Sequence, residues 1–328
     1  MHSEWAAAAE RAIVTRHLRR VWALPGTALG RSSWPPTSGD RVHRRWNYWW
    51  QAHLLDCLSD AQLRDPTQAR AATIDRVVAS ARLRNLGTWR NSYYDDLAWM
   101  GLALQRTGRD VGFFLGELRH GWTPDAGGGI RWRRGDDFKN APTNGPAAIL
   151  HARAGDTGRA RELLDWMDDT LVDPATGLVH DGLRAGSGEL VRAIYSYCQG
   201  VYLGACLELS EPDRAARTVR AAAAHCAPGG VLRGQGGGDG GLFAGILARY
   251  LALAAKRLAA PESATARDLV LTSAEAAWTG ASEAPGGPLF GPEWSEPAPE
   301  PPPPAGHAAG DLSVQLGAWM LLEAAATL

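Results

Sequence analysis

A repeated pair of helices constrains this chain more than any other feature of its sequence. Apolar residues recur about every 3.6 positions through most of the chain, which is the period of a helix that buries one side. Capping residues and first-turn prolines mark helix starts, and loops rich in glycine, proline and asparagine separate the segments. We find no convincing run of alternating residues that predicts a strand. The pattern predicts twelve helices, over 3–23, 46–63, 66–85, 92–107, 109–119, 140–154, 158–171, 189–209, 212–226, 240–258, 261–278 and 308–326.

These predicted helices alternate between two classes. One class is rich in tryptophan, tyrosine, glycine and small polar residues, and its members begin near residues 46, 92, 140, 192, 240 and 311. The other class is amphipathic, with arginine and glutamate on one face. The spacing corresponds to a helix-hairpin repeat of about 48 residues. A helix that is apolar all round must be buried on every side. The sequence therefore predicts an all-α (α/α)6 barrel, with an inner and an outer ring of helices, as one domain over residues 1–328.

The last repeat is longer than the others because of the segment 279–306, which contains the run PAPEPPPP. We expect a proline-stiffened surface loop there and not a linker between domains, because one more repeat helix must follow to close the ring. Other long connections also precede the inner helices. We therefore expect the functional site at the N-terminal ends of those helices.

Composition and charge exclude several classes of partner. The chain has 34 basic and 35 acidic residues, a balance that gives no field to hold nucleic acid or an anionic membrane. No apolar run is long enough to cross a bilayer, and the first residues resemble an amphipathic helix more than a signal peptide, so we expect a cytoplasmic monomer. The four cysteines are scattered singly, and no histidine spacing matches a zinc motif. We expect neither a metal nor a cofactor.

The most informative motif is the pair Asp95-Asp96 at the start of a predicted inner helix. Helix capping alone explains many acidic pairs in a first turn. Here the neighbours Tyr93, Tyr94 and Trp99 make the helix aromatic on several faces, so at least one carboxylate must point into the barrel, where burial without a task is costly. Two carboxylates roughly 5–5.5 Å apart can perform retaining glycoside hydrolysis, one as nucleophile and the other as acid.

A second polar cluster spans 127–145 and joins a glycine-rich aromatic loop to the next inner helix. Its amide, ammonium and carboxylate groups supply the donors and acceptors that sugar hydroxyls require. A helix cap explains Asn140 equally well. Indole rings, of which the chain has 14, suit stacking on sugar faces. The residues predicted to bind substrate are Tyr94, Trp99, Trp132, Asp137, Lys139, Asn140, Asn144, Tyr197 and Gln199.

A further glycine-rich loop, over 234–241, follows Arg233. It lacks the Lys-Ser/Thr pair of a phosphate-binding loop, so nucleotide binding is not expected.

Several motifs occur in a fixed order along the chain: Trp49-Trp50, Tyr93-Tyr94-Asp95-Asp96-Leu97-Ala98-Trp99, Gly128-Gly129-Ile130-Arg131-Trp132, Lys139-Asn140-Ala141-Pro142-Thr143-Asn144 and Tyr195-Ser196-Tyr197-Cys198-Gln199-Gly200. This order resembles glycoside hydrolase family 76, the endo-α-1,6-mannanases, over about 46–319. The resemblance implies an (α/α)6 barrel and metal-free retaining hydrolysis of α-1,6-mannan, with an oligo- or polysaccharide as partner. It also implies that Asp95 is the nucleophile and Asp96 the general acid/base.

Two other functions remain open on the same barrel. A sugar epimerase or isomerase would need a pair of histidine bases in the pit, and His151 and His180 are not evidently paired. A non-catalytic glycan-binding protein would not need the intact Asp95-Asp96 pair. Incubation with linear α-1,6-mannan distinguishes the three by their products.

Overall fold

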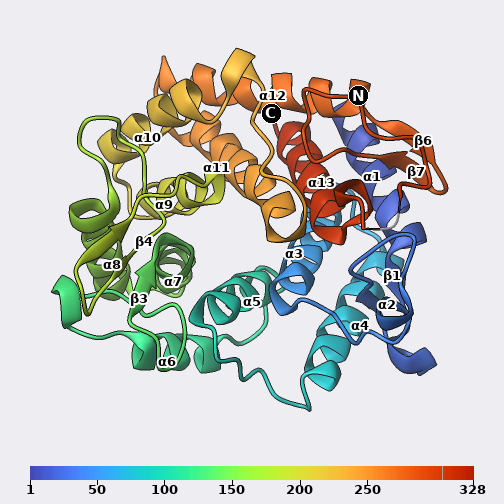
Figure 1. Ribbon diagram of the computed structural model, residues 1–328, viewed down its shortest axis with the longest axis horizontal. Coiled ribbons are helices and arrows are strands. Elements are labelled where there is room, and N and C mark those ends of the chain that lie inside the picture. Colours follow the sequence, from blue (N-terminus) through green and yellow to red (C-terminus); the bar gives the residue numbers. More distant parts are fainter. Residues whose placement is uncertain (305) are drawn as a thin grey trace. The chain divides into compact units, whose positions relative to one another are not determined.

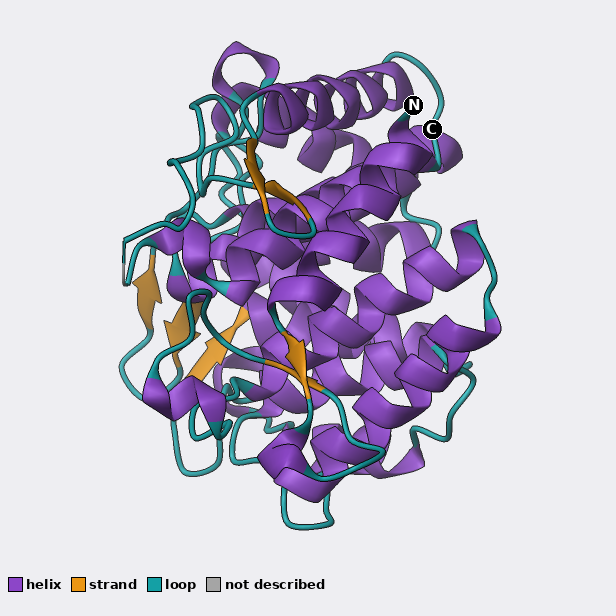
Figure 2. Ribbon diagram, turned by 90° about the vertical axis from the view of Figure 1, so that its right-hand side faces the viewer, coloured by secondary structure: helices purple, strands orange, loops and turns teal. Residues whose placement is uncertain are grey.

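A computed structural model describes residues 1–304 and 306–328, which form thirteen α-helices and a few short strands (Figures 1 and 2). In this described part of the chain, no helix is both long and apolar enough to cross a membrane. The chain divides into two compact units. The first unit comprises Met1–Trp89, Gly229–Ala248 and Leu269–Leu328, and the second comprises Arg90–Pro228 and Arg249–Asp268. The prediction of a single domain stays a prediction.

The second unit contains three helical hairpins, whose helices are α5 (Tyr94–Arg106), α6 (Gly112–Gly121), α7 (Ala141–Arg153), α8 (Thr157–Leu171), α9 (Ser196–Glu208) and α10 (Pro212–His225). Helices α5, α7 and α9 pack side by side, and each is covered by the helix that follows it (Figure 1). Gly145 permits the close approach of α7 to α9, because a Cβ atom there would lie 2.5 Å from the Val201 side chain. Within this unit, the alternation of buried and one-sided helices therefore follows the two classes in the sequence.

A small antiparallel sheet covers part of the second unit. Its strands are β3 (Phe138–Asn140), β4 (Gly182–Arg184) and β5 (Glu189–Val191), in the order β3-β4-β5. The prediction of no strands, with a helix from residue 189, is wrong here, since α9 begins at Ser196. Residues 189–191 pair with β4 across a turn in which Gly188 has a φ of +74°. That pairing is a local hairpin, which the assignment of residues 189–209 to a helix overlooked.

The first unit contains α1 (His2–Arg16), α2 (Ser38–Arg41), α3 (Tyr48–Arg64), α4 (Gln68–Arg84) and α13 (Leu312–Ala326). Helix α13 packs against α1 and α3, and α4 packs against α3 (Figure 1). Helices α11 (Phe243–Arg257) and α12 (Glu262–Thr279) each have residues in both units. Gly245 of α11 meets Gly317 of α13 closely, because a Cβ on Gly245 would lie 2.5 Å from the Gly317 carbonyl oxygen.

Two predicted boundaries in the first unit need correction. The first helix, predicted to reach residue 23, ends at Arg16, after which β1 (Leu18–Arg19) pairs with β2 (Leu29–Gly30). The predicted loop 279–306 contains a hairpin of β6 (Ser282–Ala284) and β7 (Gly287–Leu289), and residue 305 lies outside the described residues. Arg16 anchors this hairpin by donating to the carbonyl oxygens of residues 285, 287 and 288.

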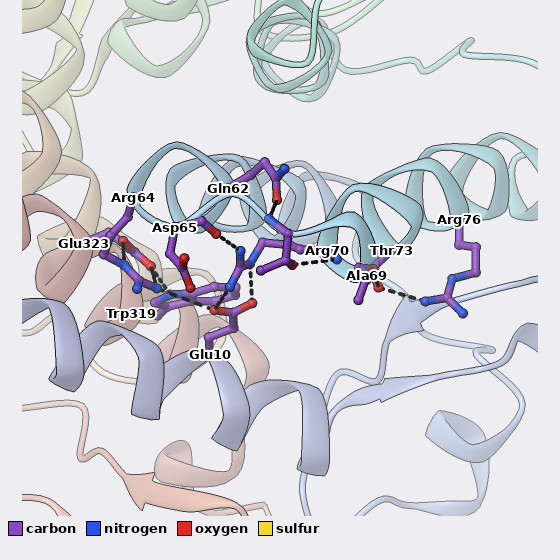
Figure 3. A network of polar contacts seen from close by, with 11 residues as sticks. Glu10, Gln62, Arg64, Asp65, Ala69, Arg70, Thr73, Arg76, Trp319 and Glu323 are labelled. Carbon is purple, nitrogen blue, oxygen red and sulfur yellow. Dashed lines mark hydrogen bonds and ion pairs between the residues drawn. The ribbon is translucent and has the colours of Figure 1, made fainter.

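A charged network ties four helices of the first unit together (Figure 3). Arg64 of α3 pairs with Glu323 of α13 at 2.9 Å, and Glu323 also accepts a hydrogen bond from Trp319 Nε1 at 2.9 Å. Glu10 of α1 pairs with Arg70 of α4 at 2.6 Å and with Arg64 at 3.5 Å. Because each of these largely buried charges has a partner of opposite sign, removal of one partner would leave an uncompensated charge.

One side-chain device recurs on four helices. In each case an amide side chain accepts from the N–H of one loop residue and donates to the C=O of the same residue. The pairs are Gln51 with Gly30, Gln315 with Phe290, Asn144 with Ile130 and Gln199 with Val179. We call these the amide clamps. They fix the incoming loop on the first turns of the helix, which is where the sequence predicts the functional groups.

Candidate active site

The Asp95-Asp96 pair lies in the first turn of α5, as the sequence predicts. Tyr93 is the N-cap residue, and both carboxylates are partly exposed. The free N–H groups and the helix dipole at this end favour negative charge. The second unit therefore presents two adjacent carboxylates at the N-terminal end of one helix.

Asp95 accepts a hydrogen bond at each of its carboxylate oxygens. Trp132 Nε1 donates to Oδ2 at 2.9 Å, and the backbone N–H of Asp96 donates to Oδ1 at 2.8 Å. These N–H donors orient the carboxylate and complement a negative charge.

Asp96 has different surroundings. Its Oδ2 accepts a hydrogen bond from the Asn91 amide at 2.6 Å, and the Asn91 Oδ1 in turn accepts from the Tyr93 N–H at 3.0 Å. The sequence marks Asn91 as part of the helix start but does not predict its contact with Asp96. Its amide fixes the rotamer of Asp96, so the two neighbouring aspartates are positioned by different groups.

Trp132 is placed by its backbone as well as by its ring. Its N–H donates to the Phe138 carbonyl at 2.7 Å, and its C=O accepts from the Tyr94 N–H at 2.8 Å. The ring meets Tyr93 edge-on, with centroids 5.0 Å apart, and the Arg133 guanidinium lies 5.7 Å from its centroid. The indole is therefore fixed between strand β3 and the first turn of α5, with part of its surface exposed.

Lys139 holds the loop that leads to Trp132. Its ammonium donates to three carbonyl oxygens, those of Thr123, Asp125 and Gly128, at 2.5–2.9 Å. The side chain is fully buried, and burial lowers the pKa of Lys139 to about 8. The sequence predicts that Lys139 contacts the substrate. Its donors are instead directed to the backbone, so the structure favours a positioning role for it.

Two further predicted contacts, Asn144 and Gln199, are amide clamps. Both side chains are fully buried. Besides its clamped loop residue, Asn144 donates to the Asn140 carbonyl at 2.9 Å, and Gln199 donates to the Tyr195 carbonyl at 3.0 Å. In this geometry both amides bond to the backbone of the loops around the carboxylates, so the structure favours a positioning role for them.

Asn140 occupies the N-cap position of α7, but its side chain caps no backbone N–H. Its Oδ1 instead accepts a hydrogen bond from the Thr143 hydroxyl at 2.6 Å. The helix-cap interpretation is therefore right about its position and wrong about its side chain.

The remaining predicted residues differ in exposure. Tyr94 and Trp99 are each only 5% exposed, and Tyr94 packs against Gly121 at the end of α6, so both belong to the core in this structure. Asp137 is exposed, pairs with Arg184 at 3.3 Å and accepts from the Gly186 N–H at 3.2 Å. The aromatic pit surface predicted from Tyr94 and Trp99 is thus not available.

Tyr197 lies in the first turn of α9 and near two carboxylates. Burial raises the pKa of its phenol, and the negative charges of Asp181 and Asp95 raise that pKa further. Burial also raises the pKa of Asp181 to about 6. Sequence reasoning missed Asp181, because it is a single acidic residue in a loop with no motif of catalytic spacing around it. The Asp181 carbonyl accepts from the Ala141 N–H at 2.8 Å, which joins its loop to the start of α7.

Across residues 1–304 and 306–328, no three histidine, cysteine, aspartate or glutamate side chains gather as metal ligands would. The site itself offers carboxylates, amides, an indole and a phenol as its chemical groups.

Comparison with known proteins decides the family. The model of glycosyl hydrolase family 76 matches residues 114–318. The chain belongs to this family. No curated protein sequence matches the chain.

Solved structures resemble the chain along its length. The α-1,6-mannanase GH76A of Salegentibacter sp. HEL1_6 is 30% identical, with 99% of each chain covered and a TM-score of 0.87. The Lin0763 protein of Listeria innocua is 29% identical, covers 99% of this chain and 97% of its own, and also gives a TM-score of 0.87. The match to these structures confirms the predicted fold class, a helical (α/α)6 barrel.

A third structure is an inactive variant of the Salegentibacter enzyme in complex with α-1,6-mannotriose. In that variant two consecutive aspartates are replaced by asparagine. It has the same identity, coverage and TM-score as the parent enzyme.

Proposed function

We propose that this family 76 hydrolase is a retaining endo-α-1,6-mannanase, with Asp95 as nucleophile and Asp96 as general acid/base. The observation that carries the proposal is the position of Asp95, whose two carboxylate oxygens each accept an N–H hydrogen bond beside a second carboxylate on the same helix turn. Asp96 is oriented next to it by the Asn91 amide. In the proposed mechanism Asp95 stays charged while Asp96 exchanges a proton.

The relatives support the same substrate and the same pair. The Salegentibacter mannanase binds α-1,6-mannotriose in a form inactivated at two consecutive aspartates, and Asp95-Asp96 is a consecutive pair in a family motif of this chain.

In the first step the Asp95 carboxylate attacks the anomeric carbon of a mannose unit. The bond from that carbon to O6 of the next mannose breaks, and O6 receives the Asp96 proton. The products are a glycosyl ester on Asp95 and a shortened chain that departs.

In the second step Asp96, now ionised, takes a proton from water, and the water oxygen attacks the same anomeric carbon. The ester bond breaks and Asp95 returns as a carboxylate. Two inversions retain the α configuration.

Three groups of the second unit are the proposed sugar contacts. Trp132 offers the exposed part of its ring to a pyranose face, and Asp137 and Tyr197 offer hydrogen bonds to hydroxyls. The loops that carry these groups are ordered by Lys139, Asn144 and Gln199.

Incubation with linear α-1,6-mannan tests the proposal. We expect shortened chains of mixed length, as internal cleavage produces, and no change in the identity of the sugar. A changed monosaccharide would indicate an isomerase, and retention of intact mannan without turnover would indicate a binding protein. The isomerase is disfavoured because His151 and His180 each face their own carboxylate, Asp156 at 3.0 Å and Asp173 at 3.9 Å.

A further inference from the structure

Asp239 of the first unit accepts two indole hydrogen bonds on one oxygen atom. Nε1 of Trp49 and Nε1 of Trp50 each lie 2.9 Å from its Oδ1. The two tryptophans belong to the first turn of α3, and Asp239 lies in the 3-10 turn η4 (Gly238–Leu242) that precedes α11. The mechanism proposed above uses none of these residues.

The loop that carries Asp239 is held in place by its backbone. The Gly238 N–H donates to the Asp311 carboxylate at 2.7 Å, and a Cβ on Gly237 would lie 2.7 Å from the same carboxylate. Gly236 and Gly238 have φ values of +79° and +58°, which side chains rarely adopt. The glycines of this loop are therefore needed to bring Asp239 to the tryptophans. This role accounts for the glycine-rich run over 234–241, for which no nucleotide is expected.

The two tryptophans differ in what they leave accessible. Trp50 is 4% exposed and serves to hold the carboxylate. Trp49 is partly exposed, and its ring is supported by Phe243, with centroids 6.4 Å apart, and by His53 at 5.4 Å. A rigid indole with one accessible part is preorganised for contact, since little side-chain freedom is lost on binding.

Asp239 itself is exposed, and among the described residues its second oxygen, Oδ2, has no hydrogen-bond partner. An acceptor thus lies beside the accessible indole. A pyranose matches this pair of features, because its C–H face stacks on an aromatic ring while its hydroxyls donate to a carboxylate. A phosphate or another anion does not match, because Asp239 would repel it.

We propose that Trp49 and Asp239 form a second carbohydrate-binding subsite, which takes one pyranose unit of an α-mannan chain. The sugar stacks on the Trp49 ring and donates a hydroxyl hydrogen bond to Asp239 Oδ2, while Trp50 positions the carboxylate. The choice of an α-mannan ligand rests on the proposed function. The subsite adds sugar contacts from the first unit to those proposed in the second.

The test measures binding of linear α-1,6-mannan by calorimetry to the full chain, with Asp95 and Asp96 both changed to Asn so that no cleavage occurs. We expect Trp49→Ala to weaken binding by about tenfold, a typical effect of losing one aromatic contact. Asp239→Asn should weaken binding severalfold and still fold, since Asn keeps the size and one acceptor for the indoles. The matched control is Trp22→Ala, since Trp22 is 47% exposed in the same unit but stacks on Arg84.

Unchanged affinity in both Trp49→Ala and Asp239→Asn, with binding by the parent, would overturn the subsite and leave the proposed function intact. An equal loss in Trp22→Ala would also overturn it, because the effect would not be specific to the Asp239 site. If the unsubstituted chain neither binds nor cleaves mannan, the proposed function fails and the subsite fails with it.

Discussion

Asp95 and Asp96 are adjacent on one helix turn, yet different groups hold their side chains. The indole N–H of Trp132 and a backbone N–H both reach Asp95, whereas Asp96 is held by the Asn91 side chain. Sequence alone places the pair in the first turn, because local periodicity and capping residues mark where the helix starts. The indole partner comes from the loop over 128–132, so only the tertiary structure reveals it.

Substitution within the pair should separate the two roles. Asp95→Asn should abolish turnover and prevent any covalent intermediate, because the nucleophile is gone. Asp96→Ala should slow mannan cleavage severely but spare the first step on a dinitrophenyl mannobioside, whose leaving group needs no proton.

Azide provides the readout for this experiment. Added azide should rescue the Asp96 variant and give an α-azide by two inversions. An α-azide formed by the Asp95 variant, instead of the Asp96 variant, would reverse the assignment, and a β-azide from the Asp96 variant would indicate single displacement.

Trp132→Phe isolates the indole hydrogen bond while keeping an aromatic ring. We expect kcat to fall by roughly ten- to a hundredfold, the range for loss of a hydrogen bond to a charged group, about 1.5–3 kcal/mol. The control is Trp166→Phe, which removes an indole bond to the Ala126 carbonyl in the same loop. Equal effects of the two substitutions on kcat would show that the Asp95 contact has no special role.

Asp181 should make the free energy of unfolding depend on pH. Burial raises its pKa from 3.8 to about 6, so the folded chain binds more protons than the unfolded chain between those values. The contribution of this group to the free energy of unfolding therefore rises as the pH falls through that window. Denaturant titrations of wild type and Asp181→Asn from pH 7 to 4 should show it.

Asp173→Asn supplies a control of opposite sign. A hydrogen bond from the Ala175 N–H lowers the pKa of Asp173, so its contribution is lost as the pH falls. A wild-type minus Asp181→Asn difference that decreases toward low pH would contradict the account.

At the scale of single elements, the loop over 123–132 depends on one buried lysine. The local pattern around Lys139 does not predict this role. Lysine is normally exposed, and it is fully buried only where partners surround its ammonium group. Its partners are backbone carbonyls that only the folded loop brings together. The strand Glu189–Val191 was missed for a different reason, because its short hairpin with β4 directly precedes the helical pattern of α9.

Lys139→Met should loosen this loop. The three carbonyls lose their ammonium, and we expect a loss of about 2–5 kcal/mol in the free energy of unfolding. Hydrogen exchange should quicken over 123–132, and kcat should fall because Trp132 follows the loop. Lys256→Met, at an exposed position in the last turn of α11, is the matched control. Unchanged exchange in the Lys139 variant would refute the positioning role.

For the whole molecule, the alternation of two helix classes predicts the fold class from sequence, and the match to family 76 structures confirms it. Periodicity succeeds here because each helix is defined mainly by interactions between residues close in sequence. It fails for the site's supporting residues, such as Asp181 and the amide clamps, whose roles depend on loops packed from elsewhere in the chain. The carboxylate pair could be found because its two members are adjacent in sequence.

The most direct test of the central claim is the anomeric configuration of the first product. Proton NMR should follow wild-type enzyme acting on α-1,6-mannotetraose at early times, before mutarotation equalises the anomers. The account predicts that the new reducing end forms first as the α anomer. A β anomer formed first, or no cleavage at all, would contradict retaining hydrolysis by Asp95 and Asp96.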